Sequence, residues 1–417
     1  MDLKFLREHS EEARRLLALR RSQADIAAIL HLDEKRRKLV QQRDQARHRQ
    51  REVNDLVARA KKEKTEVSEK LLAQARELSE MVKELEAELK RIEDEQERLV
   101  ELLPNRIHPS VTGEEEIVYN WGNLPVFEFQ PLAHWDLAEV LGIVDFETAA
   151  RLAGSRFVLF RGQGALLERA LINFFLDTAV RKYGYTEIAP PLFANPPTLK
   201  TAGQLPFLEG EMYHLKEDEL YLIPTAEPQL VAYYREKTLD ESQLPLKLVA
   251  YTPCFRREAG SYGRDVRGMI RIHQFDKVEL VRLARPESSY DALEEMRQEA
   301  ESLLQALQLP YRVKRLAAWD IAFQSAKTYD LEVYAAGCQR WLEVSSISNC
   351  EDFQTRRGKI RVRGSNGKTF YPHALNGSAL ALPRTFIAII ENFQQQDGSV
   401  IIPEVLRPYM AGLERIK

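Results

Sequence analysis

Apolar residues recur every seven positions through the first hundred residues of the chain, separated by runs of polar residues. Two such series are present: Leu32, Leu39, Ala46, Val53 and Ala60, then Leu71, Leu78, Leu85, Ile92 and Leu99. A seven-residue repeat is typical of helices that pair along an apolar seam. Because the polar stretch at 61–70 separates the two series, the pattern predicts two helices, each about 50 Å long, that fold back into an antiparallel coiled coil.

The distribution of helix-breaking residues supports a long helical segment at the start of the chain. All 19 glycines and all 19 prolines lie after residue 103, and Pro104 is the first of them. Glycine and proline are the residues least compatible with a helix interior. We therefore expect an N-terminal helical domain over 1–103 and a second domain over 104–417.

The rest of the chain predicts a sheet with helices packed on it. Short stretches of strand-like composition occur at 221–227, 246–255, 269–281, 311–316, 328–335 and 341–348. Helical patterns occur at 162–184, 288–308 and 383–395, and a short strand follows the first of them. Strands joined by turn-rich segments, with few strand–helix–strand alternations, favour an α+β fold built on an antiparallel sheet.

Composition narrows the class of protein. Apolar residues make up 44% and charged residues 29% of the chain, which indicates a soluble globular protein with a strongly charged portion. No apolar run approaches the roughly 18 residues that span a membrane, and the N-terminus lacks the apolar region of a signal peptide. Cys254, Cys338 and Cys350 form no CxxC pair, which predicts free thiols and a reducing, cytoplasmic location. Neither a Walker loop nor a GxGxxG dinucleotide motif is present.

Charge is distributed unevenly over the two predicted helices. Residues 35–64 carry twelve Lys/Arg against four Asp/Glu, whereas residues 66–103 carry six against twelve. Charge complementarity between the paired helices explains part of this pattern. A second interpretation adds a stripe of basic side chains that binds nucleic-acid phosphates. The net charge of the whole chain is −3, so any such surface is local.

The segment at 255–279 carries the most concentrated chemistry. It combines Arg256, Glu258, Arg271, Phe275 and Glu279 around a glycine-rich loop, GSYGRDVRG, that could swing over a ligand. Arginine binds phosphate in a bidentate geometry, and an aromatic face stacks on a purine. Carboxylates accept hydrogen bonds from amino and hydroxyl groups. Together these residues indicate a site that holds a nucleotide and a small polar substrate.

This segment resembles motif 2 of the class II aminoacyl-tRNA synthetases. Its sequence, FRREAGSYGRDVRGMIRIHQFDKVEL, is similar to that of the seryl-tRNA synthetases. The resemblance covers nearly the whole chain: the helical arm, GYTEIAPP in motif 1, TAE at 225–227, ISNCEDFQTRR, and ALNGSALALPRTFIAIIENF in motif 3. It implies ATP-dependent activation of L-serine to seryl-adenylate and transfer of the seryl group to the 3′ end of tRNA(Ser). Whether tRNA(Sec) is also a substrate stays open.

The resemblance implies roles for individual residues in the ATP site. Catalysis would rest on three arginines that neutralise phosphate charge: Arg256, Arg271 and Arg384. The ATP-binding set would be Arg256, Arg257, Glu258, Ile272, Phe275, Glu343, Val344, Ser345, Ser346 and Arg384, with Phe275 stacked on adenine. Glu343 and Ser346 would hold Mg²⁺, which prefers oxygen ligands. No zinc is expected, since the cysteines lack metal-ligand spacing.

The resemblance also implies a serine pocket. Its members would be Thr225, Ala226, Glu227, Arg256, Glu279 and Ser378. We assign Glu279 and Ser378 to the serine hydroxyl, and Thr225 and Glu227 to its ammonium group, although this split is open. A pocket that hydrogen-bonds a hydroxyl strongly rejects analogues that lack it.

Three further residues in and near these motifs are interpreted as minor. Strand alternation would place His273 on one face with Arg271 and Phe275, but the serine carboxylate is already ionised and needs no general base. We therefore interpret His273 as structural or adenine-lining. Val266 stands where relatives often have a hydroxylated residue, and Pro383 where they often have glycine. Both departures should affect only fine kinetics.

The resemblance implies two macromolecular partners. In the family the helical arm binds tRNA, whose acceptor end enters the site of the other subunit, and here Arg36, Arg43, Arg47 and Lys61 would contact it. Motif 1 implies a C₂ homodimer. The helix at 162–184 supports this, because its apolar surface is broader than a single buried face requires. The residues of this surface are Leu166, Leu167, Leu171, Phe174 and Phe175.

Two other functions compete with this one. The chain could be a synthetase-like paralogue that activates an amino acid and loads a carrier other than tRNA. It could also be a structural coiled-coil protein whose second domain merely binds a nucleotide. The long arm argues against the first alternative, since an enzyme without tRNA needs no such rod. The set of Arg256, Arg271 and Arg384 argues against the second.

Overall fold

The computed structural model describes residues 1–259 and 267–417. The chain divides into two compact units, Met1–Pro104 and Asn105–Lys417. The expected swing of the glycine-rich loop, and the interpretation of Val266, concern residues 260–266 and lie outside the described residues. In the described part of the chain, no helix has the length and apolar character that crossing a membrane requires.

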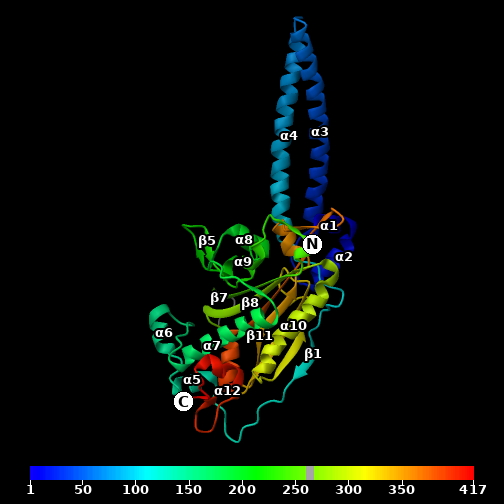
Figure 1. Ribbon diagram of the computed structural model, residues 1–417. Coiled ribbons are helices and arrows are strands. Elements are labelled where there is room, and N and C mark those ends of the chain that lie inside the picture. Colours follow the sequence, from blue (N-terminus) through cyan, green and yellow to red (C-terminus); the bar gives the residue numbers. More distant parts are fainter. Residues whose placement is uncertain (260–266) are drawn as a thin grey trace. The chain divides into compact units, whose positions relative to one another are not determined.

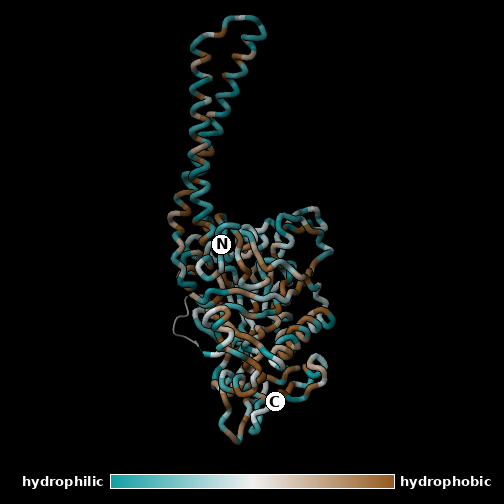
Figure 2. The backbone as a smooth tube through the Cα atoms, turned by 90° about the vertical axis from the view of Figure 1, so that its left-hand side faces the viewer, coloured by the Kyte–Doolittle hydropathy of each residue, from teal (hydrophilic) through white to brown (hydrophobic). Residues whose placement is uncertain are grey.

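The first unit is dominated by a hairpin of two long helices (Figure 1). Its elements are α1 (Leu3–Glu8), α2 (Ser10–Leu19), α3 (Ile26–Lys62) and α4 (Glu69–Glu101). Asp25 caps α3 by accepting a hydrogen bond from the Ala28 amide, and Ser68 caps α4 in the same way at Leu71. The connection between the long helices is mainly hydrophilic (Figure 2). The predicted antiparallel coiled coil is confirmed.

The apolar seam of the hairpin follows the predicted heptads. Leu32, Leu39, Leu89 and Ile92 form one buried cluster. Further positions of the seam are also buried: Ala46, Val53, Leu78 and Val82. Toward the tip the seam is less protected, because Ala60 and Leu71 are only partly buried. Burial of this stripe holds two helices together that would be marginal as isolated helices in water.

The second unit is built on an eight-stranded sheet in the order β1-β9-β10-β11-β14-β8-β7-β2. The strands are β1 (Glu116–Trp121), β2 (Thr186–Glu187), β7 (Leu246–Phe255), β8 (Gln274–Ala284), β9 (Tyr311–Arg315), β10 (Lys327–Ala335), β11 (Arg340–Asn349) and β14 (His373–Ala381). All neighbouring pairs are antiparallel except β2 and β7, which are parallel. The predicted α+β class with an antiparallel sheet is confirmed.

Helices and short strands surround this sheet (Figure 1). The helices are α5 (His134–Val140), α6 (Phe146–Ala153), α7 (Gln163–Asp177), α8 (Pro196–Ala202), α9 (Glu227–Ala232), α10 (Ser289–Ala306), α11 (Phe353–Arg357) and α12 (Leu382–Asn392). Smaller sheets are formed by β3 (Phe193–Ala194), β5 (Leu220–Leu222) and β4 (His214–Leu215), by β13 (Thr369–Phe370), β12 (Arg361–Arg363) and β6 (Thr238–Asp240), and by β15 (Val400–Ile401) and β16 (Arg415–Ile416).

One face of the large sheet carries the main core. Val278 and Leu280 of β8 pack there with Leu171 of α7, Leu293 of α10 and Phe386 of α12. Because side chains alternate along a strand, residues 275, 277 and 279 of β8 point to the opposite face. That opposite face is where the charged residues of the motif 2 segment collect.

Two of the predicted strands had wrong boundaries. The stretch predicted at 221–227 ends as a strand at Leu222, and Glu227 begins α9. The stretch predicted at 269–281 begins only at Gln274. Ile270 and Ile272 are buried in a turn, so their apolar character did not mark a strand. Arg271 and His273 therefore do not share a strand face with Phe275, as alternation had predicted.

Strand β14 was not predicted at all. Its sequence contains Asn376 and Gly377, residues that are depleted in strands. The structure gives a reason for the glycine: a Cβ at Gly377 would lie 2.9 Å from Cγ1 of Ile347 on the neighbouring strand β11. Close approach of the two strands therefore excludes a side chain at this position.

Candidate active site

A cavity of about 520 Å³ opens in the second unit, over the charged face of the sheet. Its lining includes most of the predicted site residues: Thr225, Glu227, Arg256, Glu258, Arg271, Ile272, Phe275, Glu279, Glu343, Val344, Ser346, Ser378 and Arg384. These residues come from β8, β11, β14, α9 and α12 and from the loops beside them, including the segment that follows β7. A site of this size suits a nucleotide-sized ligand.

Alternation along β8 places three functional side chains in the cavity. Phe275, Lys277 and Glu279 occupy every second position and all line it. The Lys277 ammonium lies 2.7 Å from the Glu279 carboxylate, and both side chains are almost fully buried. The Ser378 hydroxyl donates to the same carboxylate over 3.4 Å from the paired strand β14. Lys277, Glu279 and Ser378 therefore form a preformed polar group in the cavity wall.

Arg256 follows the end of β7 and bends back over the cavity. Its Nε donates to the Pro224 carbonyl at 3.3 Å, and its guanidinium lies 5.1 Å from the centroid of the Phe275 ring. The backbone amide of Arg256 donates to the His273 carbonyl at 2.9 Å. His273 accordingly holds the Arg256 backbone, and it is not part of the cavity lining.

Arg271 and Glu258 form an ion pair at the edge of the cavity. Nη1 of Arg271 lies 3.1 Å from Oε2 of Glu258. Glu258 adopts a left-handed backbone conformation with φ 49°, which turns the chain after Arg257. The Arg257 side chain points elsewhere, over the Tyr213 ring at 6.0 Å, and does not line the cavity.

A β-bulge in β11 brings Glu343 and Ser346 to one side. Residues three apart on a regular strand face opposite ways. Here Leu331 pairs with Ser345 and Glu332 with Glu343, so Val344 is the additional residue of a bulge. Both Glu343 and Ser346 consequently line the cavity.

Arg384 reaches the cavity from the first turn of α12. Its Nη1 donates to the Glu343 carbonyl at 2.7 Å and lies 3.4 Å from the Glu343 carboxylate. Its Nε donates to the Ile270 carbonyl at 3.4 Å. Pro383 lies directly before it in the first turn, a position that suits proline because no intrahelical donor is needed there.

Glu227 lies at the buried end of the cavity among amide donors. Its Oε1 accepts from Nε2 of Gln354 at 2.6 Å, from Nδ2 of Asn376 at 3.0 Å and from Nε2 of Gln324 at 3.4 Å. Burial, and next the nearby negative charge of Glu279, raise the pKa of Glu227 to about 7. A cation bound beside Glu227 would stabilise its ionised form.

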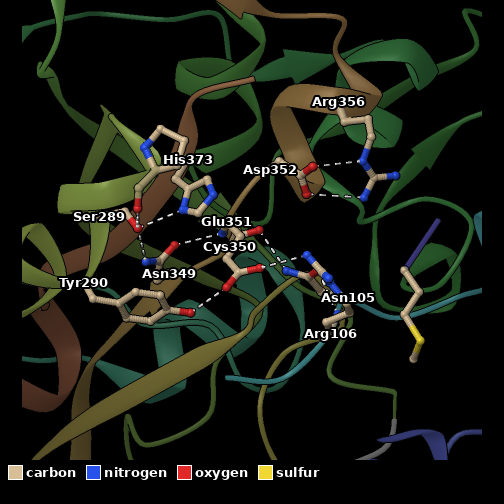
Figure 3. Close-up of polar contacts among 12 residues, drawn as sticks. Asn105, Arg106, Ser289, Tyr290, Asn349, Cys350, Glu351, Asp352, Arg356 and His373 are labelled. Atoms are coloured by element: carbon tan, nitrogen blue, oxygen red, sulfur yellow. Dashed lines mark hydrogen bonds and ion pairs between the residues drawn. The ribbon is translucent and has the colours of Figure 1, made fainter. Parts of the chain in front are cut away.

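A second polar network supports the segment that supplies Gln354 (Figure 3). Nδ2 of Asn105 donates to the Cys350 carbonyl at 2.8 Å, and Tyr290 donates to Glu351 at 2.8 Å. Oδ1 of Asn349 accepts from the Glu351 amide at 2.8 Å. These contacts fix the turn after β11, from which α11 directs Gln354 toward Glu227.

The sequence analysis missed several members of the cavity lining and included three residues outside it. The missed polar residues are Gln204, Glu211, Lys277, Gln324, Ser348 and Asn376, and Gln354, outside the lining, donates to Glu227. Alternation on β8 could have indicated Lys277. The amide side chains of Gln324, Gln354 and Asn376 come from segments far away in the sequence, and no local pattern indicates that they belong to the site. Ala226 and Arg257 are not in the lining, and neither is Ser345, whose hydroxyl donates to the Ser378 carbonyl.

One of the three cysteines lies in a cluster that spacing could not reveal. All three are free thiols. Cys338 lies beside His134 and Glu391, and the possible ligand atoms of the three residues are all within 4.8 Å of one another. The expectation of no zinc rested on the spacing of the cysteines and on the family resemblance, and spacing could not reveal that His134 and Glu391 lie beside Cys338.

The basic residues of the arm differ in their surroundings. Arg36 lies 3.8 Å from Glu93, and Arg47 lies 2.5 Å from Glu86, both across the hairpin. Arg43 pairs with the adjacent Asp44. Lys61, in the last turn of α3, is exposed and forms no ion pair within the described residues. Charge complementarity thus accounts for Arg36 and Arg47 but not for Lys61.

The fold and the cavity define a class. The antiparallel sheet presents arginines, an aromatic side chain and buried carboxylates to one cavity, as expected for the core of a class II aminoacyl-tRNA synthetase. Residues 212–393 match the model for the tRNA synthetase class II core domain (G, H, P, S and T), and residues 1–107 match the seryl-tRNA synthetase N-terminal domain.

Individual relatives narrow the class to a family. The serine--tRNA ligase of Thermodesulfovibrio yellowstonii is 47% identical over 425 residues, with all of both chains covered. The seryl-tRNA synthetase of Pyrococcus horikoshii, solved with ATP, has a TM-score of 0.93 at 35% identity and covers 100% of this chain and 99% of its own. The cytoplasmic enzyme of Naegleria fowleri, solved with AMP, has a TM-score of 0.88 at 28% identity, covering 100% and 98%. The chain belongs to the seryl-tRNA synthetase family.

Proposed function

We propose that this chain activates L-serine with ATP to give seryl-adenylate and then transfers the seryl group to the 3′ end of tRNA(Ser). The observation that carries the proposal is the combination of groups in the cavity lining: two buried carboxylates with hydrogen-bonding partners, Glu227 and Glu279, and three partly exposed arginines. A zwitterionic amino acid fits between them, with its ammonium toward the carboxylates and its carboxylate toward Arg256.

The buried end of the cavity suits serine. Glu279 is already paired with Lys277, so its remaining hydrogen-bonding capacity is available for a hydroxyl, together with Ser378. Glu227 has amide donors, and none of the described residues places a cation within hydrogen-bond range of it, which supports its assignment, with Thr225, to the ammonium group. Alanine would leave this polar end unsatisfied, and such a loss lowers catalytic efficiency strongly.

The arginine end of the cavity suits ATP. Adenylation develops negative charge on the phosphate oxygens, so positioning and charge neutralisation lower the barrier. Arg256 can contact both the serine carboxylate and the α-phosphate, while Arg271 and Arg384 can hold the β- and γ-phosphates. Phe275 offers a ring for adenine beside the Ile272 backbone. Glu258 is engaged with Arg271 at 3.1 Å, so adenine would share it with that arginine.

The residues present also fit a magnesium ion. Asp330 pairs in register with Ser346, and its buried Oδ1 has no hydrogen-bond partner within the described residues. Burial, followed by the nearby Glu343 charge, raises the pKa of Asp330 well above its ordinary value, and a divalent cation would relieve this repulsion. Glu343 and Ser346 would hold the ion, which would neutralise phosphate charge. No zinc is part of the proposal.

The arm and the surface of the second unit suit two macromolecular partners. We propose that four basic residues contact tRNA phosphates: Arg36, Arg43, Arg47 and Lys61. Of these, Lys61 is the least engaged within the hairpin.

Apolar residues exposed on the second unit support a C₂ homodimer. Helix α7 supports it less, because its Leu167, Leu171 and Phe175 are already buried. The exposed residues lie in the loop after β1, at the end of α5 and in α6: Val126 is 95% exposed, Val140 71% and Leu152 74%.

Two measurements test the proposal. Exchange of pyrophosphate into ATP should depend on serine and be weak with alanine or threonine, and tRNA(Ser) should then be charged. A chain that exchanges with serine but charges only a carrier protein would be the paralogue that loads a carrier other than tRNA.

Sedimentation should give a dimer at micromolar concentration, whereas a species of about 48 kDa would exclude the homodimer. The proposed place of action is the cytoplasm, where free thiols persist.

A further inference from the structure

A buried polar cluster of His134, Cys338 and Glu391 contacts the cavity wall at Met269. Glu391, near the end of α12, receives five hydrogen bonds. Oε1 accepts from the backbone N–H and the Nδ1 of His134, both at 2.8 Å, and from the Cys338 thiol at 2.9 Å. Oε2 accepts from the amides of Gly337 and Cys338, at 2.8 and 3.0 Å. Burial alone would raise the pKa of Glu391, but the hydrogen bonds from His134 and Cys338 bring it below its ordinary value.

The tautomer of His134 follows from its two neighbours. Its Nε2 accepts the backbone N–H of Met269 at 3.1 Å, so this nitrogen carries no proton. The proton therefore lies on Nδ1 and is donated to Glu391. A metal ion at this cluster would need the lone pair of Nδ1 and a deprotonated Cys338 thiol, whose pKa burial and Glu391 raise. The cluster is thus arranged for hydrogen bonding and not for metal coordination.

Three consecutive residues of α5 contact three consecutive residues of the motif 2 segment. The guanidinium of Arg267 lies 2.5 Å from the Asp136 carboxylate and 5.0 Å from the Trp135 ring centroid. Gly268 has φ 78°, and a Cβ there would lie 2.0 Å from Nε2 of His134. Met269 donates to that same nitrogen. The register of this segment against α5 is therefore fixed at three successive positions.

The same segment continues into the cavity. Met269 and Ile270 both line it, and the Ile270 carbonyl accepts from Nε of Arg384. Arg384 and Glu391 lie at opposite ends of α12. The residues from Met269 to Ile270 are thus held on one side by His134 and hold Arg384 on the other.

We propose that His134 and Glu391 are positioning residues for the nucleotide: they hold the Met269–Ile270 backbone so that Arg384 faces the phosphates of ATP. This inference rests on the proposed function. Neither residue contacts substrate, so both act through Arg384 and the cavity wall. A displacement of about 1 Å in such a group can lower the rate by about a hundredfold.

Three variants of the cluster test this. His134→Phe keeps a ring but removes the acceptor for Met269, whereas His134→Gln can place an amide oxygen near the position of Nε2. Glu391→Gln removes the charge that orients His134. We expect the KM for ATP in serine-dependent pyrophosphate exchange to rise about tenfold in His134→Phe and Glu391→Gln, and less than threefold in His134→Gln. The KM for serine should stay within about twofold in all three.

A matched control separates positioning from general loss of stability. Glu299→Gln changes another buried carboxylate, which accepts from Tyr185 at 2.8 Å and lies outside the cavity lining. It should lower the melting temperature without changing the KM for ATP. If His134→Phe and Glu391→Gln behave like Glu299→Gln, or raise both KM values equally, the cluster is only structural and the proposal is overturned.

Two further measurements separate this inference from the proposed function and from the alternative that the cluster binds a metal ion. ATP binding without serine, measured by calorimetry, should weaken in His134→Phe even if the wild-type chain prefers another amino acid. Unchanged binding would contradict the inference. Elemental analysis of the purified wild-type protein should show no stoichiometric zinc. Zinc that is present in the wild type and lost in Cys338→Ser would overturn the hydrogen-bonding assignment.

Discussion

The arm hairpin and the cavity of the second unit are both rich in charge, but they use it differently. In the arm, Arg47 and Glu86 pair with 45% and 41% of their side chains exposed. In the cavity, Lys277 and Glu279 pair with 9% and 4% exposed. Exposed pairs contribute about 0–1 kcal/mol and are screened by salt. Buried pairs need exact partners, because an unpaired buried charge is strongly unfavourable.

This difference predicts how each region responds to substitution. The arm presents many weak, interchangeable charges, so single changes there should have graded effects that depend on salt. The cavity presents few charges with defined partners, so single changes there should have large effects. The following predictions test that contrast, in order of decreasing effect.

Arg256→Ala should have the largest effect. Arg256 is placed to contact both the serine carboxylate and the α-phosphate, and loss of one such transition-state donor lowers kcat by about 10²–10³-fold. The measurement is the rate of serine-dependent pyrophosphate exchange, with the melting temperature recorded alongside. Arg257→Ala is the matched control, because the adjacent side chain lies over Tyr213 and outside the cavity lining.

Comparison of Arg256→Ala with Arg257→Ala shows whether Arg256 contacts the reacting groups. Exchange should stay within about twofold of wild type in Arg257→Ala. If Arg256→Ala retains more than about a tenth of the wild-type rate, Arg256 does not contact the reacting groups.

The pH dependence of serine binding should show the second largest effect. Glu227 has a pKa of about 7 in the free protein, so it is largely protonated at pH 6 and ionised at pH 8. Only the ionised form attracts the serine ammonium, which stays protonated over this range. The KM for serine should therefore fall about tenfold as the pH rises from 6 to 8.

Glu227→Gln checks that Glu227 causes this dependence. The variant should bind serine weakly and lose the change between pH 6 and pH 8, while the KM for ATP follows wild type. A serine KM that is flat over this range in the wild-type protein would show that Glu227 does not receive the ammonium group.

Arg47 and its partner should show the smallest effect and separate the two interpretations of the arm. If Arg47 contacts tRNA, Arg47→Ala should raise the KM for tRNA about threefold to fivefold and reduce its salt dependence. Glu86→Gln releases Arg47 from its partner, so it should leave that KM unchanged or lower it. If both variants raise the KM equally, the pair only holds the two helices together.

The two regions also differed in how far the sequence predicted them. The arm follows a local repeat, so Leu32, Leu39 and Ile92 indicated the seam without any knowledge of tertiary contacts. In the cavity, alternation along β8 explains Phe275, Lys277 and Glu279. Gln354 and Asn376, however, reach Glu227 from segments more than 120 residues away along the chain. No local pattern encodes such contacts.

Local irregularities explain the remaining errors. The bulge at Val344 turns Glu343 and Ser346 to one side, although regular alternation would separate them. The turn before β8 buries Ile270 and Ile272 outside any strand, because it packs against His134 and Arg384. Both features lie where the cavity is built, and both depend on contacts that the sequence does not show directly.

A variant that lacks residues 35–95 tests most directly the claim that the two regions have separable roles. Serine-dependent pyrophosphate exchange should remain close to wild type, because every residue assigned to ATP and serine lies beyond 220. In the same preparation, the KM for tRNA should rise greatly and serylation at low tRNA concentration should become much slower. Wild-type charging would show that the hairpin does not bind tRNA, and a collapse of exchange would contradict the separation itself.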